Sequence, residues 1–426
     1  SLLATDWYID QLKRRTYTSS PIPSQLEHRQ YAYGVRDYIK HEALLDSVRW
    51  SLNDFMRWVS SDQPRTQYKF LLEQYDVSTT NIPKSTQQMI YYPTNQIRVP
   101  VNKENVLKSG VVKPEDAELI VDYIDIDLPT SGLYKNRLMM LDILHNNDWE
   151  RPIYFTGGSY DDSEYFWMKD YLQLDGLVYK LVPIKTPVYP NNPYQMGRID
   201  ANQMYDIVMK WDWGNSDSPD IYHDPETRKN SISFRSNITR LANALIEDKQ
   251  VEKAITVLDL AMNKMPIETF GYYSLVTPIA SAYFRAGATE KAQQIVQKLA
   301  SGYHEYMRYY AQWDNEDQLA LMEDLVGNVE RYKSLLTEVV QARDYETLAA
   351  IYNPFYESIL PFSYIYGKYD FYTELTPFVA GLYAADQLEL ARELSGHIAQ
   401  QYIDLLNRFL TLEKEQLRYF EMEIGI

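Results

Sequence analysis

The feature that most constrains the fold is an internal repeat in the second half of this 426-residue chain. Ala242–Ala261 aligns with Ala280–Leu299 at an offset of 38 residues, and Thr277–Ala292 aligns with Thr376–Ala391 at an offset of 99. The three units share a small residue within one helix, a short turn, and an alanine at which the second helix can pack closely. Such repetition is typical of helical hairpins that stack into an array. We therefore predict tetratricopeptide-like hairpins from about Ser231 onward.

The repeat is irregular, and this limits how much of the architecture it predicts. Its 38-residue offset exceeds the tetratricopeptide period of about 34 residues, so we expect longer hairpins. The second gap is 61 residues longer than the first (99 against 38) and holds further helical patterns, including one over 320–340. The sequence leaves open whether these helices continue the stack or cap it.

The first half is predicted to be mixed α/β. Apolar residues at helical spacing predict helices over 46–59 and 133–145. Segments that are rich in β-branched and aromatic residues and bounded by proline predict strands over 89–101 and 119–128.

A crossover unit is predicted next in the chain. It comprises a strand over 151–156, a helix that ends at Tyr171 and a strand over 177–183. Two strands joined through a helix usually pair in parallel within one sheet, so we expect parallel pairing here.

Length and periodicity predict two domains. The chain exceeds the roughly 250 to 300 residues at which single cores stop growing. We predict a mixed α/β domain over 1–200, a connector over 201–230 and a helical-repeat domain over 231–426.

Composition excludes several classes of function. A formal net charge of −17 argues against a nucleic-acid surface, which relies on clustered lysine and arginine. The absence of cysteine excludes disulfides, thiolate zinc sites and cysteine nucleophiles. No window approaches the roughly 18 apolar residues of a membrane helix, so we expect no direct membrane insertion.

No catalytic, metal or cofactor site is predicted. The six histidines never fall at the close spacing of a zinc motif, and a nucleophile elbow is absent. Paired carboxylates for glycoside hydrolysis require a separation that a sequence does not reveal. The chain has 59 acidic residues, so no pair stands out.

Two motifs have both a functional and a structural interpretation. Thr156–Ser159 follows a strand, where main-chain amides can hold an anion, but it lacks a P-loop lysine and precedes the carboxylates of Asp161–Glu164. Asp122, Asp125 and Asp127 suggest a metal or a carboxylate pair, with the latter two on one strand face. We favour a plain turn for the first and a solvated strand edge for the second.

Asp6 and Trp7, near the start of the chain, also have a functional interpretation as a candidate site. Thr5 or Asp6 suits a helix N-cap, and Trp7, Ile9 and Leu12 are placed to pack inward. We favour this structural role.

Aromatic residues are the one compositional excess, with 38 tyrosines. Tyr303, Tyr306, Tyr310 and Trp313 fall at helical spacing, and further tyrosines crowd the segment from Tyr352 to Tyr372. Large rigid rings with a polar tip suit contact with carbohydrate or peptide. We therefore take the first four as candidate ligand-contact residues, with half-buried packing as the alternative.

Five phrases of the sequence carry a family resemblance. They are SLLATDWYIDQLKRR, NDWERPIYFTGG, YLQLDGLVYKLVPIK, GRIDANQMYDIVMKWDWG and PDIYHDPETRKNSISFRSNITRLANALIEDKQVEKAI. Together they resemble the soluble half of the protein O-mannosyltransferase-like membrane proteins of Bacteroidetes, a family long described as a domain of unknown function.

The resemblance implies an accessory role. In that family a polytopic membrane half with a glycosyltransferase fold precedes the soluble half, and a loop of the membrane half carries the catalytic acid. We therefore expect a non-catalytic region on the periplasmic side of the inner membrane. Its expected partners are its own membrane half and a polypeptide or a glycan.

The sequence is also compatible with two other functions. One is a free-standing scaffold whose repeats bind a partner protein, and the more distant one is a carbohydrate-active hydrolase. An upstream membrane half in the native gene product would separate the accessory region from the scaffold.

Overall fold

The computed structural model describes residues 2–14, 20–45, 47–156, 166–186, 196–362, 376–384 and 386–411. The chain divides into two compact units, an N-terminal unit (Ser1–Met204) and a C-terminal unit (Tyr205–Ile426). The connector predicted over 201–230 holds helix α8 (Ala201–Val208) and the first residues of helix α9 (Pro225–Glu247).

The described part of the N-terminal unit contains three small sheets. In the first, β1 (Tyr38–His41) pairs in parallel with β3 (Tyr91–Tyr92) and antiparallel with β6 (Leu133–Tyr134). In the second, β4 (Gln96–Pro100) pairs in parallel with β2 (Trp50–Ser51) and antiparallel with β5 (Tyr123–Asp127). This architecture is mixed α/β, as the sequence predicts.

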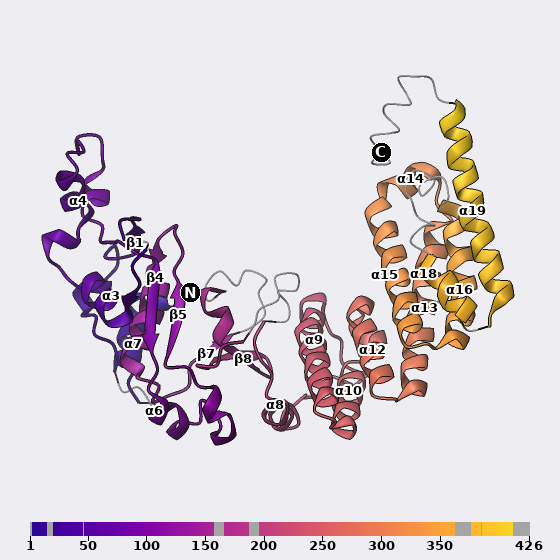
Figure 1. The fold of residues 1–426 in the computed structure, drawn as a ribbon, viewed down its shortest axis with the longest axis horizontal. Helices are drawn as coiled ribbons and strands as arrows, with labels where there is room; N and C mark the ends of the chain where they lie inside the picture. The colour runs from indigo at the N-terminus through magenta and orange to yellow at the C-terminus, as the bar shows by residue number, and fades with distance from the viewer. Residues whose placement is uncertain are drawn as a thin grey trace. The chain divides into compact units, whose positions relative to one another are not determined.

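Short helices surround these sheets. They are α1 (Asp6–Lys13), α2 (His28–Tyr31), α3 (Leu52–Val59), α4 (Tyr68–Gln74), α5 (Lys84–Gln87), α6 (Lys103–Lys108) and α7 (Lys135–Asn147), with 3₁₀ turns at Leu2–Ala4, Pro64–Thr66 and Pro114–Leu119. Helix α3 packs on β4 and on α7 (Figure 1) and contributes Phe55 and Met56 to a core that includes Ile97 and Leu141.

The predicted elements of this unit exist but begin and end elsewhere. The helix predicted over 46–59 begins at Leu52, because Trp50 and Ser51 pair with β4 and the Ser51 hydroxyl caps the helix by accepting from the Asp54 amide at 3.1 Å. The helix predicted over 133–145 begins at Lys135, because Leu133 pairs with β1.

The predicted parallel crossover is wrong. Strand β7 (Tyr154–Thr156) pairs antiparallel with β9 (Val178–Leu181), and β8 (Leu172–Asp175) pairs antiparallel with the other side of β9. Strands β8 and β9 form a hairpin whose two-residue turn begins at Gly176, with a positive φ of 72°. Glycine takes such a φ without strain, and a two-residue loop with glycine first, here Gly176-Leu177, favours a hairpin instead of a crossover. Of the predicted helix, the structure describes a 3₁₀ turn at Phe166–Tyr171.

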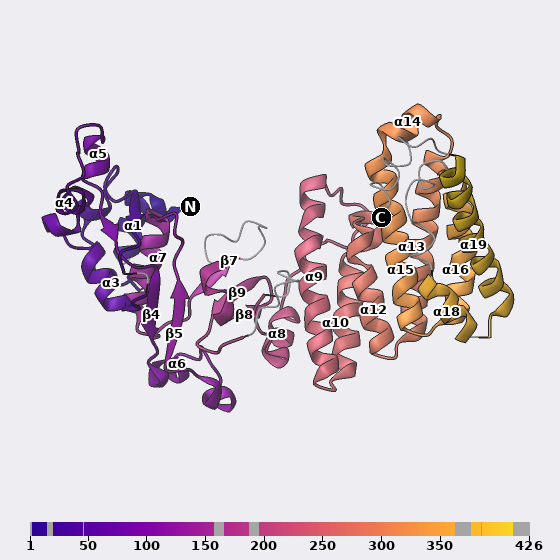
Figure 2. The same cartoon turned by 45° about the horizontal axis from the view of Figure 1, so that its top comes forward.

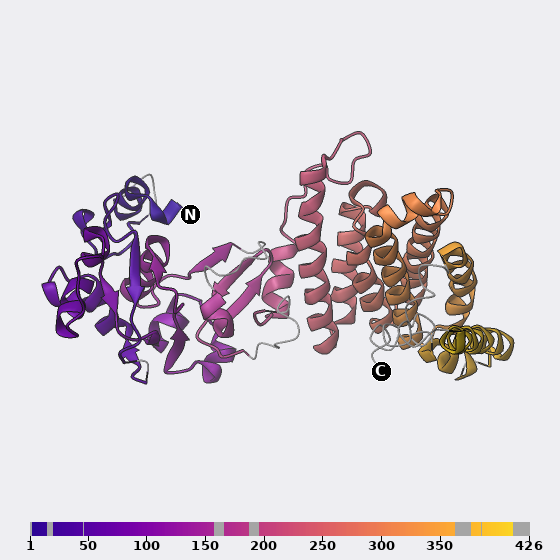
Figure 3. The same cartoon turned by 90° about the horizontal axis from the view of Figure 1, so that it is seen from above.

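The described part of the C-terminal unit contains four helical hairpins. They are α9 with α10 (Val251–Lys264), α12 (Thr277–Arg285) with α13 (Thr289–Tyr310), α15 (Met322–Gln341) with α16 (Tyr345–Ile359), and α18 (Thr376–Ala384) with α19 (Leu388–Thr411). Shorter elements are α11 (Ile267–Phe270), α14 (Asn315–Ala320), and 3₁₀ turns at Tyr273–Leu275 and Leu360–Phe362. The first three hairpins lie side by side in Figures 2 and 3.

One turn geometry recurs in all four hairpins. A residue with positive φ follows the first helix: Lys249 (61°), Gly287 (74°), Arg343 (58°) and Asp386 (62°). In each turn the next residue donates its main-chain N–H to a carbonyl five residues earlier, as Gln250 does to Leu245 at 2.7 Å. This is the Schellman arrangement that ends a helix, and its recurrence defines the repeat.

The third hairpin is the one that the sequence alignment missed. Five residues after the positive-φ residue, the other hairpins carry buried alanine (Ala254, Ala292 and Ala391), whereas the third carries buried Leu348. Helices α15 and α16 both pack against α13 and against α18. The question that the sequence left open is thus answered, because this hairpin continues the stack.

We predict that the residue five positions after the positive-φ residue sets how closely the two helices of each hairpin pack. Replacing Ala254 or Ala292, both 0% exposed, with leucine should lower the free energy of unfolding by about 1 to 3 kcal/mol through overpacking. Replacing Leu348 with alanine should lower it by about 2 to 4 kcal/mol because a cavity forms. Urea denaturation measures both effects. Unchanged stability in all three variants would contradict the structural equivalence.

Candidate functional site

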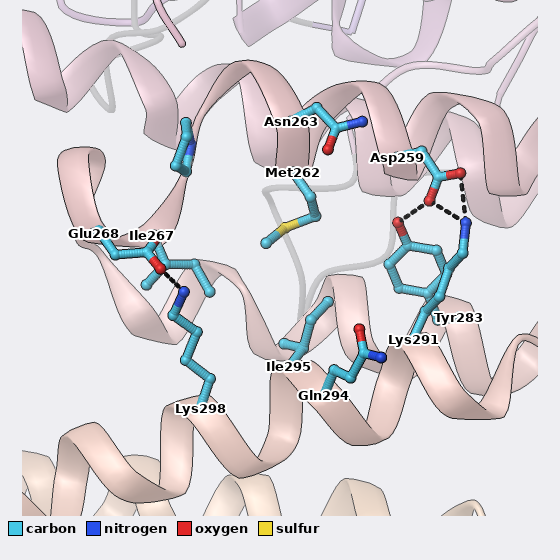
Figure 4. A pocket seen from close by; sticks show the side chains of 11 residues that line it. Asp259, Met262, Asn263, Ile267, Glu268, Tyr283, Lys291, Gln294, Ile295 and Lys298 are labelled. Carbon is cyan, nitrogen blue, oxygen red and sulfur yellow. Dashed lines mark hydrogen bonds and ion pairs between the residues drawn. The ribbon is translucent and has the colours of Figure 1, made fainter. Parts of the chain in front are cut away.

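A groove in the C-terminal unit is the candidate site. Its volume is about 470 Å³, within the range of ligand pockets. It lies between α10 and α13, the second helices of the first two hairpins, and α11 and α12 contribute to its walls (Figure 4). The lining residues are Asp259, Met262, Asn263 and Pro266 from α10 and its end, Ile267 and Glu268 from α11, Tyr283 from α12, and Lys291, Gln294, Ile295 and Lys298 from α13.

The spacing of these residues explains the groove. Asp259, Met262 and Asn263 fall at helical intervals of three and four on α10, and so do the four lining residues of α13. Each helix therefore presents one continuous stripe to the groove. Helix α13 packs closely on α15 and α16, but it packs much less on α10, so the two stripes stay apart.

Ion pairs cross the groove near both ends. At one end, the Lys291 ammonium lies 2.6 Å from Oδ2 of Asp259. The other carboxylate oxygen of Asp259, Oδ1, accepts a hydrogen bond from the Tyr283 hydroxyl at 2.8 Å. At the other end, Lys298 pairs with Glu268. Figure 4 shows both contacts as links between opposite walls. Burial, and then the hydrogen bond to Asp259, raise the pKa of the Tyr283 hydroxyl, so this tyrosine stays neutral.

Between these ends the groove is apolar at its base and polar at its rim. Met262, Ile267 and Ile295 supply aliphatic and thioether surface, while the exposed side-chain amides of Asn263 and Gln294 lie on opposite walls (Figure 4). Neither amide hydrogen-bonds another described residue. The four charged residues that line the groove carry no net charge, since each lysine is paired with a carboxylate.

A buried arginine holds the end wall in place. The Arg235 side chain on α9 is 0% exposed and donates to the carbonyl of Met265, where α10 ends, at 2.8 Å and to the carbonyl of Gly271, where α11 ends, at 2.5 Å. Both acceptors are main-chain carbonyls of C-cap residues, and the hydrogen bonds that the guanidinium donates to them are charge-assisted. Burial lowers the Arg235 pKa to about 10, so the guanidinium stays charged at neutral pH.

The four aromatic candidates do not form one surface. Tyr303 is 1% exposed and packs between Tyr273 and Tyr332, and burial raises its pKa to about 12, so it is a core residue. Tyr306 is exposed, Tyr310 is half-buried, and Trp313 lies three residues beyond α13 with its ring centroid 5.5 Å from that of Tyr309. Ligand contact by these three stays a prediction.

The three aspartates at strand β5, namely Asp122, Asp125 and Asp127, form ion pairs. Asp125 accepts two hydrogen bonds from the Arg98 guanidinium, at 2.8 and 2.9 Å, which hold the pKa of Asp125 below its usual value. Asp127 lies 3.4 Å from Arg49, and Asp122 lies 2.7 Å from Lys103. Across the described ranges, no group of three histidine, aspartate or glutamate residues is arranged to hold a metal ion.

The remaining sequence motifs have mixed outcomes. Trp7 is 54% exposed, so the prediction that it packs inward is wrong, while Ile9 on the opposite face of α1 is buried. Thr5 occupies the N-cap position without a side-chain capping bond. In the Thr156–Ser159 loop, only Thr156 lies within the described residues.

The sequence analysis did not predict one buried carboxyl group, that of Asp142. Asp142 on α7 is 0% exposed and accepts from the Gln25 main-chain N–H at 3.2 Å and from the Asn146 side-chain amide at 2.9 Å. Burial raises its pKa above the ordinary value of 3.8.

Comparison with known families gives a match over the first unit. Residues 1–203 match the TMEM260-associated domain 2 family. The match ends at the boundary between the two compact units, so the matched region coincides with the N-terminal unit and the groove lies outside it. No curated protein and no solved structure matches the chain. In the part of the chain that the structure describes, every helix is too short or too polar to cross a membrane.

We predict that Arg235 is essential for the end wall of the groove. Arg235→Met removes two charge-assisted hydrogen bonds and leaves the carbonyls of Met265 and Gly271 without this donor, which should lower the free energy of unfolding by about 2 to 4 kcal/mol. Arg308→Met, at an exposed position of α13, is the control and should change stability by less than about 0.5 kcal/mol. Equal stability of the two variants in urea denaturation would refute the role of Arg235.

The raised pKa of Asp142 leads us to predict that the stability of the fold depends on pH. Because its folded pKa is raised, its contribution to stability is fully present below the unfolded value of 3.8 and is lost as pH rises through the folded pKa. Asp142→Asn keeps the acceptor oxygen and removes the charge, so it should raise the free energy of unfolding at neutral pH. The gain should shrink as the pH approaches the unfolded value. Urea denaturation over a pH series measures this, and a gain independent of pH would contradict the assignment.

Proposed function

We propose that this chain is a non-catalytic accessory region of a membrane protein of the TMEM260-associated type. Its helical unit, built from tetratricopeptide-like hairpins, binds a polypeptide or a glycan in the groove between α10 and α13. The chain lies on the periplasmic side of the inner membrane, and its membrane half is a further partner. The family match of residues 1–203 supports the membership.

The groove is the observation that carries the binding role. It combines an apolar base, two amides without described partners and charged residues that are already paired. Ligand sites typically combine an apolar base with a few polar groups that orient the ligand. A paired carboxylate such as Asp259 is poorly placed to act as a general base, because its oxygens already accept from Lys291 and Tyr283.

The charge of the whole chain narrows the ligand further. A net charge of −17 repels anions at long range and favours neutral or basic ligands. For a polypeptide, this favours segments with lysine or arginine beside the residues that enter the groove. For a glycan, it favours neutral sugars.

Binding is tested with peptide and neutral oligosaccharide panels, measured by calorimetry, with mass spectrometry to detect any turnover. We expect micromolar or weaker binding and an unchanged ligand, as for small transient interfaces. Met262→Trp should fill the groove and lower the affinity at least tenfold. Met322→Trp, a matched change at an exposed site on α15, should leave it unchanged.

Two further variants separate the groove from the aromatic residues. Tyr306→Ala and Trp313→Ala should preserve binding if the groove is the site. Loss of binding in these variants, with Met262→Trp still active, would move the site to the end of α13. Glycosyl transfer or hydrolysis by the purified chain would overturn the non-catalytic role, and absence of all binding would leave docking onto the membrane half as the function.

A further inference from the structure

We infer that the occupant of the groove is an extended polypeptide, held through its main chain by the side-chain amides of Asn263 and Gln294. This inference rests on the proposed binding function and names the ligand class of that same site. Four properties of the groove support it.

The first property is the chemistry of the two amides. A side-chain amide offers one acceptor oxygen and two N–H donors. It can therefore donate to a carbonyl and accept from an N–H of the same peptide backbone. Asn263 and Gln294 are exposed on opposite walls and hydrogen-bond no other described residue (Figure 4). They are placed to bind both edges of a strand that runs between them.

The second property is the length of the open section. Lys291 and Lys298, which form the cross-groove ion pairs, are seven residues apart on α13. Seven residues of helix span about 10 Å at a rise of 1.5 Å per residue. An extended chain advances about 3.3 Å per residue, so about three peptide residues fit between the ion pairs.

The third property is the apolar base. Successive side chains of an extended peptide point to opposite sides, so the central residue of three faces the base when its neighbours point outward. Met262 and Ile295 line this base, and methionine adapts to side chains of varied shape. We therefore expect an aliphatic residue at the centre, with little discrimination among leucine, isoleucine and methionine.

The fourth property argues against a glycan in this groove. Sugar recognition relies on exposed aromatic faces, which supply a large rigid contact area. The aromatic side chain that lines the groove is Tyr283, and it is 2% exposed with its hydroxyl bonded to Asp259. Both lysines are paired with carboxylates, which also disfavours a phosphate or a carboxylate ligand.

The test uses heptapeptides with a central leucine flanked by serine and lysine, and the same peptides N-methylated at the residues next to the leucine. N-methylation removes a main-chain donor while the side chains stay the same. Binding to the full chain is measured by fluorescence polarisation. We expect N-methylation to weaken binding about tenfold, the scale of one to two hydrogen bonds.

The protein variants are chosen to keep shape and remove hydrogen bonding. Asn263→Leu and Gln294→Met should each weaken binding about tenfold. Gln297→Met is the matched control, because Gln297 is an exposed glutamine on the same helix that does not line the groove. All three positions are exposed, so folding should be retained, and circular dichroism checks this.

The outcomes separate this inference from the proposed function. If Met262→Trp blocks peptide binding but N-methylation and both amide variants leave it unchanged, the binding function stands and main-chain recognition is wrong. Binding of neutral oligosaccharides in the groove, without peptide binding, also preserves the function and overturns the inference. If neither ligand class binds, the binding role and this inference both fall, and docking onto the membrane half is left as the function.

Discussion

The end wall of the groove depends on one buried cation in the helical unit. Arg235 reaches from α9 to the carbonyls that end α10 and α11, so three elements of the first hairpin and its extension are fixed by a single side chain. Pro266 ends α10 at this point, and α11 then turns away to form the end wall. Because a desolvated guanidinium needs its acceptors, this arrangement has little freedom to collapse. The end wall of the groove is therefore fixed relative to α9.

The helical unit was predictable to the extent that its repeats use small residues. Ala254, Ala292 and Ala391 mark three hairpins in the sequence, and all three are buried where the second helix packs. The remaining hairpin has Leu348 at this position, so an alignment that relies on the alanines does not detect it. The better signal is the residue with positive φ five positions earlier, but the sequence shows it plainly only at Gly287. In the N-terminal unit, the glycine of the Gly176-Leu177 turn is a hairpin signal, which the sequence analysis did not use when it predicted a crossover.

The candidate site was not predictable, for a different reason. Aromatic excess drew attention to Tyr303 and its neighbours, but a ring at helical spacing packs inward when the next hairpin covers that face, as Tyr332 does for Tyr303. The lining residues of the groove are ordinary in sequence: one methionine, two amides and paired charges. They become a site only because α10 and α13 stay apart while α13 and α16 pack closely. That difference in spacing is a property of tertiary structure.

The evidence for family and the evidence for chemistry come from different parts of the chain. The TMEM260-associated match covers the N-terminal unit, where the acidic strand residues are held by Arg49, Arg98 and Lys103. The groove lies in the C-terminal unit, and its carboxylates are neutralised in the same way by lysines. A carboxyl group that acts as a general acid usually has a raised pKa, and a general base needs an oxygen within hydrogen-bond reach of the substrate. Asp142 has the shifted pKa but is fully enclosed, whereas Asp259 and Glu268 border the groove but are paired. This separation of burial from access supports the proposal that the groove binds a ligand without transforming it.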